Sequence, residues 1–491
     1  MIESIEQLDP TEELTAEIIN TKVKVGIAIL TIRTVFIQAI SFFSNAFLTF
    51  FLLPAEYGVF FLVSAVVNFL AYFSDIGFAA ALIQKKEKLT DDELKTVFTA
   101  QQVLVLLLIV IVLMVTPLIR NLYHFNQPAI YLLWALALSL LLSSLKTIPS
   151  VLLERKLEFN KLVLPQIIET IVFNLAAIYF AWNGFGVSSF TIAILLRGIT
   201  GLIAMYVVAP WMPGISFSVK SFKSILKFGV PYQANAFLAM IKDDGMTIFL
   251  GTILGSQGIG LLGWAQKWAY APLRFFMDQV IKVTFPAFSR LQNNKEQLSK
   301  AVSKSIMFVC ILVFPFLTML VLTAPILIKI IPKYNKWEGA LTALTILSIT
   351  SALAAVTTPL TNTLNAIGRI SLTFKLMIMW TVLTWVFVPI LTILYGLNGA
   401  ATGLTLVGLS SFVAIYLVSK YVDLDYLQIV GKPVLASVIM GVLVVFVKNM
   451  LAVSPLQVAS MIISGLISYG VVIFFLEESV RIFLKSQFKK R

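Results

Sequence analysis

Hydrophobic residues fall in long runs that are separated by short polar segments along almost the whole chain. A helix needs about 20 apolar residues to cross ~30 Å of hydrocarbon, and each run is long enough. The pattern predicts fourteen membrane-spanning helices, at roughly residues 25–52, 57–83, 97–119, 129–153, 162–182, 187–209, 228–254, 259–288, 305–330, 339–365, 372–395, 399–419, 433–452 and 456–476. We therefore expect an all-α polytopic membrane protein.

Composition supports this class. Of the 491 residues, 59% are hydrophobic and only 12% are charged, which excludes an ordinary soluble globular protein. The single cysteine, Cys310, lies in an apolar run, so we expect a small core residue and no internal disulfide. The net charge of +13 comes mostly from basic residues in short loops beside hydrophobic segments, as membrane insertion requires, so no nucleic-acid partner is expected.

The distribution of basic residues predicts the topology. If both termini are cytoplasmic, 25 lysines and arginines lie in cytoplasmic segments and 5 in outer loops. Such a bias is typical of short cytoplasmic loops, and one missing helix would reverse it further along the chain. The bias therefore indicates an even number of spans.

The first twelve helices resemble two copies of a six-helix bundle, because Leu52 and Gly58 have the same spacing as Leu254 and Gly260. Two halves of the same orientation would bind a substrate between them. The acidic start precedes a full span, so we expect no cleaved signal peptide. The expected organisation is an acidic cytoplasmic segment (1–24), an N-lobe (25–210), a C-lobe (211–420), two further helices (421–480) and a basic cytoplasmic tail (481–491).

Charged residues inside the predicted spans are the candidate functional residues. A charge at the bilayer centre costs about 2.5 to 3.5 kcal/mol. This number of charges therefore indicates that they face water or a charged partner inside the protein. Lys267, Arg274, Asp278 and Lys282 share one helix face. The cations outnumber the acids, which favours an anionic ligand such as a phosphate or an acidic sugar. The candidate substrate-binding residues are Arg33, Arg197, Lys242, Lys267 and Arg274, with Lys146 a further intramembrane cation.

The intramembrane acids are Asp75, Glu169, Asp243, Asp244 and Asp278. Two interpretations stay open for them: they bind a coupling ion, or they pair with cations to hold helices together. The run from Lys242 to Gly245 predicts a break or bend in its helix, with a snorkelling lysine beside one buried carboxylate as the alternative.

Several short motifs carry less information. Trp264 and Trp268 fit an interfacial aromatic belt better than a sugar-stacking platform. Gly258, Gly260 and Gly263 spell GxGxxG without a preceding strand, so a tight turn is expected instead of a dinucleotide site. Gly399 and Gly403 form a helix-packing GxxxG motif.

Catalytic and metal sites have no support in the sequence. The one histidine, His124, cannot build a metal site alone. No phosphate-binding loop is present either, so we expect no nucleotide cofactor, and a coupling ion, Na⁺ or H⁺, stays unassigned.

Five segments resemble the polysaccharide flippases of the Wzx type, in the superfamily of multidrug, oligosaccharidyl-lipid and polysaccharide (MOP) exporters. They are LPAEYG (53–58), SDIGFAAALIQ (74–84), ERKLEF (154–159), FGVPYQAN (228–235) and FPAFSRLQ (285–292). The resemblance implies two six-helix lobes plus two helices in a bacterial inner membrane. It also implies export of an undecaprenyl-diphosphate-linked oligosaccharide by alternating access, with membrane lipids as partners. Whether a polysaccharide polymerase and chain-length machinery also take part stays open.

Two other functions remain as alternatives. A multidrug antiporter of the same superfamily would want acidic and aromatic residues for organic cations, which the excess of Arg and Lys disfavours. An integral-membrane polymerase or ligase would need a positioned acid, base or nucleophile, and no such constellation is visible. We therefore expect a transporter and not an enzyme.

Overall fold

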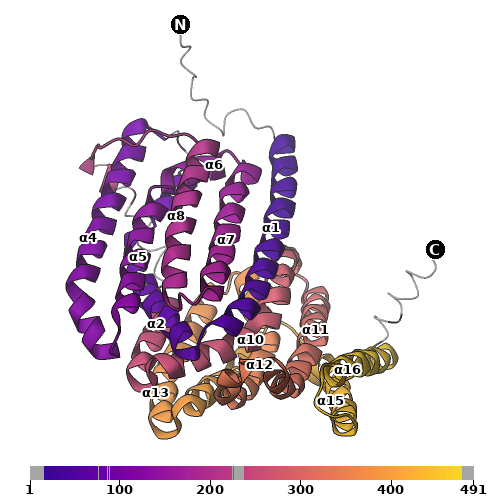
Figure 1. The fold of residues 1–491 in the computed structure, drawn as a ribbon. Coiled ribbons are helices and arrows are strands. Elements are labelled where there is room, and N and C mark those ends of the chain that lie inside the picture. Colours follow the sequence, from indigo (N-terminus) through magenta and orange to yellow (C-terminus); the bar gives the residue numbers. More distant parts are fainter. Residues whose placement is uncertain are drawn as a thin grey trace. The chain divides into compact units, whose positions relative to one another are not determined.

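The computed structural model describes residues 16–75, 77–85, 87, 89–219, 221–223, 225, 237–477 and 481. The regular elements of this part of the chain are helices. Figure 1 labels most of them. The FGVPYQAN segment, residues 1–15 of the predicted acidic segment and most of the predicted basic tail lie outside the described residues. The predicted class, an all-α polytopic membrane protein, is confirmed.

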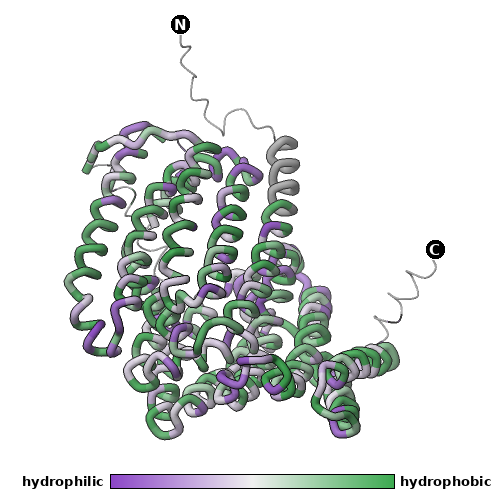
Figure 2. Tube along the Cα trace, viewed as in Figure 1, coloured by the Kyte–Doolittle hydropathy of each residue, from purple (hydrophilic) through white to green (hydrophobic). Residues whose placement is uncertain are grey.

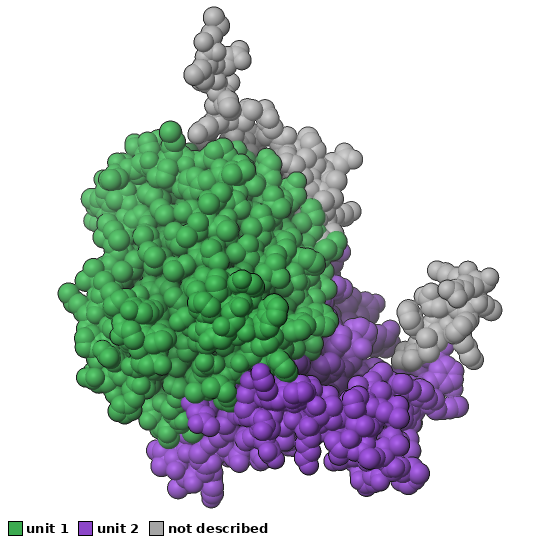
Figure 3. Space-filling view, in the orientation of Figure 1, with its two compact units in different colours: residues 1–256 green, residues 257–491 purple. Residues whose placement is uncertain are grey.

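The chain divides into two compact units, residues 1–256 and 257–491 (Figure 3). Unit 1 contains α1 (Ala16–Phe51), α2 (Pro54–Ala71), η1 (Tyr72–Ser74), α3 (Phe78–Gln84), α4 (Asp91–Tyr123), α5 (Gln127–Ser144), α6 (Thr147–Arg155), α7 (Phe159–Trp182), α8 (Ser188–Val208) and η2 (Ile241–Gly245). Helix α10 (Met246–Leu291) begins in unit 1 and continues into unit 2. Unit 2 also contains α11 (Lys295–Ile330), η3 (Tyr334–Ala340), α12 (Leu341–Ala366), α13 (Ile370–Leu409), α14 (Phe412–Ser419), α15 (Tyr426–Met450) and α16 (Pro455–Leu476).

Twelve helical stretches among the described residues are long and apolar enough to cross a membrane. Figure 2 shows hydrophobic residues along most of their length. Two of the stretches, Phe237–Leu291 and Ile370–Ser419, have 55 and 50 residues, more than twice the roughly 20 that a span needs. The first is broken at Gly255 and the second at Tyr395 and Gly396, where the backbone leaves the helical region. The count of fourteen spans, the cytoplasmic termini and the predicted lobe boundaries stay predictions.

The break at Gly255 has a backbone reason. Its φ of 62° lies in the left-handed region that glycine adopts at little cost. Gly258, Gly260 and Gly263 lie within the helix that follows, so the predicted tight turn at these glycines is wrong. The run from Ile241 to Gly245 forms a π-helical turn, η2, instead of a break.

Within unit 1, α7 packs against α8 and α1, and α5 packs against α4 and α8. Small residues allow these close approaches. A Cβ atom on Gly201 of α8 would lie 2.0 Å from Oε1 of Glu169 on α7, and one on Gly198 would lie 2.6 Å from the Leu142 side chain. The glycines of α8 therefore set its distance from α5 and α7.

The core of unit 2 surrounds α11, which packs against α12, α15 and α16. Val302, Ile306, Val309, Cys310 and Val313 are fully buried at the spacing of one helix face. Cys310 is a core residue, as predicted. Gly399 and Gly403 lie where α13 doubles back after its break, and Cβ atoms there would clash with the backbone of Leu391 and Val388. The packing role predicted for this GxxxG motif is confirmed.

Proline in α11 creates a contact to α16. Pro315 has no N–H, so the carbonyl oxygen of Ile311, four residues earlier, cannot form its helical hydrogen bond. The hydroxyl of Tyr469 on α16 donates to this oxygen at 2.9 Å. The bond satisfies a polar group inside an apolar helix pair, where the bilayer offers no substitute.

Candidate functional site

A polar cavity of about 510 Å³ lies inside unit 1, between α1, α3, α5, α6, α7 and α8. Six ionisable side chains line it: Arg33, Asp75, Lys146, Glu154, Glu169 and Arg197. Four of these, Arg33, Asp75, Glu169 and Arg197, are among the candidates that the sequence selects. Residues from five separate predicted spans thus reach one cavity.

Glu169 holds two cations in this cavity. Lys146 Nζ donates a hydrogen bond to its Oε1, and Arg197 Nε lies 3.6 Å from its Oε2. The guanidinium of Arg197 also lies over the ring of Phe173, 5.8 Å from the ring centre. The Glu169 and Lys146 side chains are 13% and 14% exposed, whereas Arg197 is 53% exposed. Glu169 therefore anchors Lys146 deep in the cavity and leaves Arg197 accessible.

Two polar atoms that line the same cavity have no hydrogen-bond partner among the described residues. These are Nε of Arg33 on α1 and Oε1 of Gln166 on α7, and both atoms are buried. An unpaired buried donor or acceptor costs about 1 to 3 kcal/mol. A polar ligand or water that entered the cavity would relieve this cost.

The carboxyl groups differ in how they are held. Asp75 Oδ1 accepts hydrogen bonds from the backbone N–H groups of Phe78 (2.7 Å) and Ala79 (3.4 Å) at the start of α3. Burial raises the pKa of Glu154, which lies on α6 outside the candidate spans. The lining has three cations and three carboxyl groups, so protonation of Glu154 would make it net positive.

The remaining candidates lie on η2 and α10. Lys242 Nζ and Asp243 Oδ1 form an ion pair at 2.8 Å, and Asp244 hydrogen-bonds to the side chain of Asn68. A π-helical turn of this kind is rare and is frequently found at functional sites. Asp243 thus pairs with a cation of its own turn, whereas Asp244 contacts an amide, and the choice between ion coupling and helix pairing stays open.

The predicted charged face of α10 is present. Lys267, Arg274, Asp278 and Lys282 are all exposed, and Lys267 lies close enough to Arg274 for their charges to interact. Like charges repel unless an anion lies between them. This face of α10 is therefore a second cationic surface within unit 2.

Trp264 does not belong to an interfacial belt. It is 5% exposed and stacks on Trp337, which is fully buried, with ring centres 5.5 Å apart. Trp268 contacts it edge to face. Both interpretations weighed for the Trp264 ring, belt and sugar platform, are wrong, because the ring is part of the core of unit 2.

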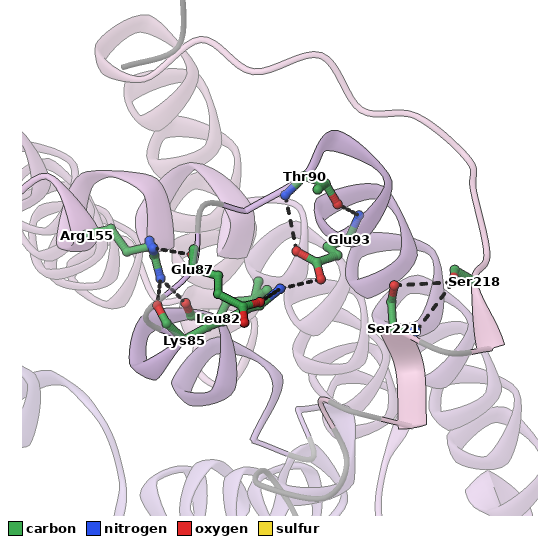
Figure 4. Close-up of polar contacts among 8 residues, drawn as sticks. All are labelled: Leu82, Lys85, Glu87, Thr90, Glu93, Arg155, Ser218 and Ser221. Carbon is green, nitrogen blue, oxygen red and sulfur yellow. Dashed lines mark hydrogen bonds and ion pairs between the residues drawn. The ribbon is translucent and has the colours of Figure 1, made fainter. Parts of the chain in front are cut away.

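Two of the resemblance segments contact each other at one end of unit 1 (Figure 4). Arg155 of the ERKLEF segment donates to the carbonyl oxygens of Leu82 (2.7 Å) and Lys85 (2.6 Å), where α3 ends, and to that of Glu87 (3.1 Å). The last carbonyls of a helix lack helical partners and attract cations. The arginine therefore fixes the end of the SDIGFAAALIQ segment.

A second contact holds the other side of the same loop. Glu93 accepts a hydrogen bond from Lys85 Nζ at 2.5 Å and completes a capping box with Thr90 at the start of α4 (Figure 4). The loop from α3 to α4 is thus fixed by one arginine and one glutamate. These contacts give a physical reason for the arginine of the ERKLEF segment.

The sequence interpretation missed Glu154 and Gln166 as cavity residues. Gln166, Glu169 and Thr170 share one face of α7 at spacings of three and four, and this pattern was available in the sequence. Glu154 gave a weaker signal, because it stands in a basic segment that looks like a loop.

Unit 2 contains an apolar groove of about 710 Å³ between α11, α12 and α15. Leu317, Val321, Ile349, Val438 and Val442 are among its lining residues. The polar members, such as Ser348 and Ser437, donate their hydroxyls to carbonyls of their own helices. The groove therefore presents an almost purely hydrocarbon surface.

The model of a family described as "Polysaccharide biosynthesis protein" matches residues 47–342 of the chain. The chain belongs to this family. The match contains all five resemblance segments, so the predicted relationship is confirmed. Within the part of the chain that the structure describes, no three His, Cys, Asp or Glu side chains gather as metal ligands would.

Relatives and solved structures agree with the family. The lipopolysaccharide biosynthesis protein WzxC of Escherichia coli (strain K12) is 26% identical over 386 residues, which are 76% of this chain and 74% of WzxC. The structure of the lipid II flippase MurJ in an inward closed conformation has a TM-score of 0.77, with 16% identity over 92% of this chain and 99% of that one.

An inward-facing multidrug resistance transporter of the MATE family, in the MOP superfamily, has a TM-score of 0.61. Its identity is 16% over 81% of this chain and 98% of its own. At such identity the likeness shows the fold alone. This member of the polysaccharide biosynthesis protein family therefore is a multi-pass membrane protein with the fold of the MOP transporters.

Proposed function

We propose that the protein is a flippase that moves an undecaprenyl-diphosphate-linked oligosaccharide across the cytoplasmic membrane by alternating access. The carrying observation is the pair of cations on Glu169: Lys146 and Arg197 share one carboxylate, and Arg197 stays half exposed. A diphosphate would find there a guanidinium that binds phosphate oxygens in pairs. The buried Nε of Arg33 offers a further donor.

The cationic face of α10 supports the same cargo. Lys267 and Arg274 are exposed on one face and repel each other, so binding of an anion there would be favourable. The apolar groove of unit 2 suits the other end of such a lipid, because its lining of apolar side chains would contact a polyprenyl chain without leaving a polar group unpaired. The relatives add that WzxC acts in lipopolysaccharide biosynthesis and MurJ on lipid II, as their names state.

The multidrug antiporter remains the second candidate. Three carboxyl groups, Asp75, Glu154 and Glu169, line the cavity of unit 1 and would attract organic cations. Two of them are already engaged, Asp75 by backbone N–H groups and Glu169 by two cations. A coupling ion, Na⁺ or H⁺, would compete with the same partners, and we assign it to no residue.

The test is the amount of lipid-linked oligosaccharide that accumulates in the inner leaflet after deletion of the gene. Wild type should abolish the accumulation. Arg197→Ala and the double variant Lys267→Ala plus Arg274→Ala should not, whereas Lys300→Ala, an exposed lysine paired only with Glu296, should rescue fully. If no lipid-linked intermediate accumulates, or if Arg197→Ala and the double variant Lys267→Ala plus Arg274→Ala both rescue as well as wild type, the substrate assignment is wrong.

A drug-efflux assay on the same strains separates the two candidates. Export of organic cations that persists in the lysine and arginine variants would favour the antiporter. Turnover of lipid-linked sugar by the purified protein without translocation would instead establish an enzyme.

A further inference from the structure

A non-helical segment, residues 209–218, follows α8 and crosses the first turns of α4. Together with Val219, where the next helical residues begin, we call it the strap. It is fixed by two hydrogen bonds from its backbone N–H groups to side chains of α4. Ser216 N donates to Thr99 Oγ1 at 3.3 Å, and Ser218 N donates to Thr96 Oγ1 at 3.1 Å. Figure 4 shows Ser218 beside the end of α4 that begins at Thr90.

The strap has two different faces. Trp211, Ser216 and Ser218 are half-buried, and Trp211 packs on Phe98 with ring centres 5.2 Å apart. Between and beside them the apolar residues point away from the protein: Met212 and Ile215 are 89% and 91% exposed, and Phe217 and Val219 are also exposed. In an extended chain, alternate side chains point to opposite faces. The exposed face is thus apolar throughout.

The position of the strap on α4 indicates what the apolar face meets. Thr96 and Thr99 precede Val103 by seven and four residues, so all three lie on one stripe of the helix. The stripe continues through Leu106, Leu107, Val110 and Leu113, which are exposed apolar residues of a candidate span. Along these residues the neighbour is lipid. The strap covers the end of this stripe at Thr96 and Thr99. The outer face of the strap therefore continues the lipid-facing surface of α4.

The residues of α4 beside the strap indicate how deep in the membrane the strap lies. The first turn of α4 carries Asp91 and Asp92, which are exposed and belong in water. Gly214 lies against the stem of Lys95, one turn further in. Extended backbone does not survive in the hydrocarbon core, because its N–H and C=O groups would lack partners. The strap therefore suits the headgroup layer, where apolar side chains reach the acyl boundary.

We propose that the strap is a membrane-surface anchor, with Met212, Ile215, Phe217 and Val219 inserted into the headgroup layer beside α4. The sequence continues with Lys220, Lys223 and Lys227, and basic residues next to an apolar membrane anchor favour an anionic surface. The anchored partner is thus an anionic lipid surface. This inference does not depend on the cargo.

Spin labels on the full-length protein in bilayers test the proposal. Ile215→Cys and Phe217→Cys are made in a Cys310→Ala background, which removes the one native thiol. Val103→Cys serves as the lipid reference and Asp92→Cys as the water reference. Accessibility to oxygen, which partitions into lipid, is compared with accessibility to a water-soluble nickel chelate.

The labels at Ile215 and Phe217 should have an oxygen-to-nickel ratio several-fold above that at Asp92 and nearer to that at Val103. The ratio should rise further when phosphatidylglycerol is added to phosphatidylcholine bilayers. Labels that behave like the one at Asp92 would overturn the proposal, and a ratio independent of phosphatidylglycerol would overturn the anionic partner. If Phe217→Cys does not yield a monodisperse protein, Met212→Cys, whose side chain is almost fully exposed, gives the same reading.

Discussion

Lys146 donates a hydrogen bond to Glu169, 23 residues further along the chain, and the two side chains are mostly buried. Arg197 approaches the same carboxylate from α8. One glutamate thus joins three segments around the cavity of unit 1. This carboxylate thus holds two of the three cations that line the cavity.

Removal of the carboxylate should therefore be costly. We expect Glu169→Ala to lower the free energy of unfolding by about 3 to 5 kcal/mol, because it leaves a buried lysine unpaired. Thermal unfolding followed by tryptophan fluorescence in detergent measures the loss. Glu296→Ala breaks an exposed pair with Lys300 and should cost no more than about 1 kcal/mol. Equal effects of the two variants would contradict a structural role for Glu169.

Gly201 leaves the space that the Glu169 carboxylate occupies. Gly201→Ala would place a Cβ 2.0 Å from Glu169 Oε1, so the glutamate must move away from Arg197. We expect a loss of about 1 to 3 kcal/mol in stability and a defect in complementation. Gly470→Ala is the matched control, since nothing lies within 4 Å of its Cβ position. A Gly201→Ala protein as active and stable as the control would show that the carboxylate is not held there.

Arg155 should be sensitive to a change that keeps its charge. Arg155→Lys loses the planar donors that reach three carbonyl oxygens, and we expect a cost of about 1.5 to 3 kcal/mol. Amide hydrogen exchange of α3 and the following loop should speed up. Lys156→Ala changes the exposed neighbouring cation and should leave exchange unchanged. Amide hydrogen exchange in Arg155→Lys that matches wild type would show that Arg155 does not fix this loop.

Trp264 should affect stability without affecting the cargo. Trp264→Ala removes a buried ring stacked on Trp337, and we expect a loss of about 3 to 5 kcal/mol. Trp264→Phe should restore most of the stability and full complementation. Trp182, which is 69% exposed at the end of α7, gives the control Trp182→Ala with little change. Loss of transport in a stable Trp264→Phe protein would instead support a sugar platform.

Hydropathy was enough to predict the helical membrane class, because burial in lipid demands long apolar runs whatever the packing. The cost of a charge inside a span was enough to select Arg33, Asp75, Glu169 and Arg197, which line one cavity. The partners were not predictable. Whether Glu169 pairs with Lys146 or with another cation depends on the crossing angles of α6, α7 and α8. No local sequence pattern predicts these angles.

Local ambiguity explains the wrong predictions. Several glycines follow Leu254, and only the one at Gly255 adopts a positive φ, so composition alone cannot choose the site of the break. Trp264 near a span end fits an aromatic belt by sequence, yet a partner 73 residues later, Trp337, buries it. Asp243 and Asp244 suggested a break or bend; the helix is not broken there, because one extra residue in the turn accommodates them as η2, and the bend stays a prediction.

The bond from Tyr469 to Ile311 has a consequence for biogenesis. The two residues are 158 positions apart, so the carbonyl exposed by Pro315 stays open while four further helical segments, α12 to α15, are synthesised. Only the arrival of α16 supplies the hydroxyl. Helices that insert one by one can associate later inside the membrane. The hydrogen bonds of unit 2 are thus complete only after α16 has been synthesised. The proline in α11 leaves a free carbonyl oxygen at the position where α16 binds.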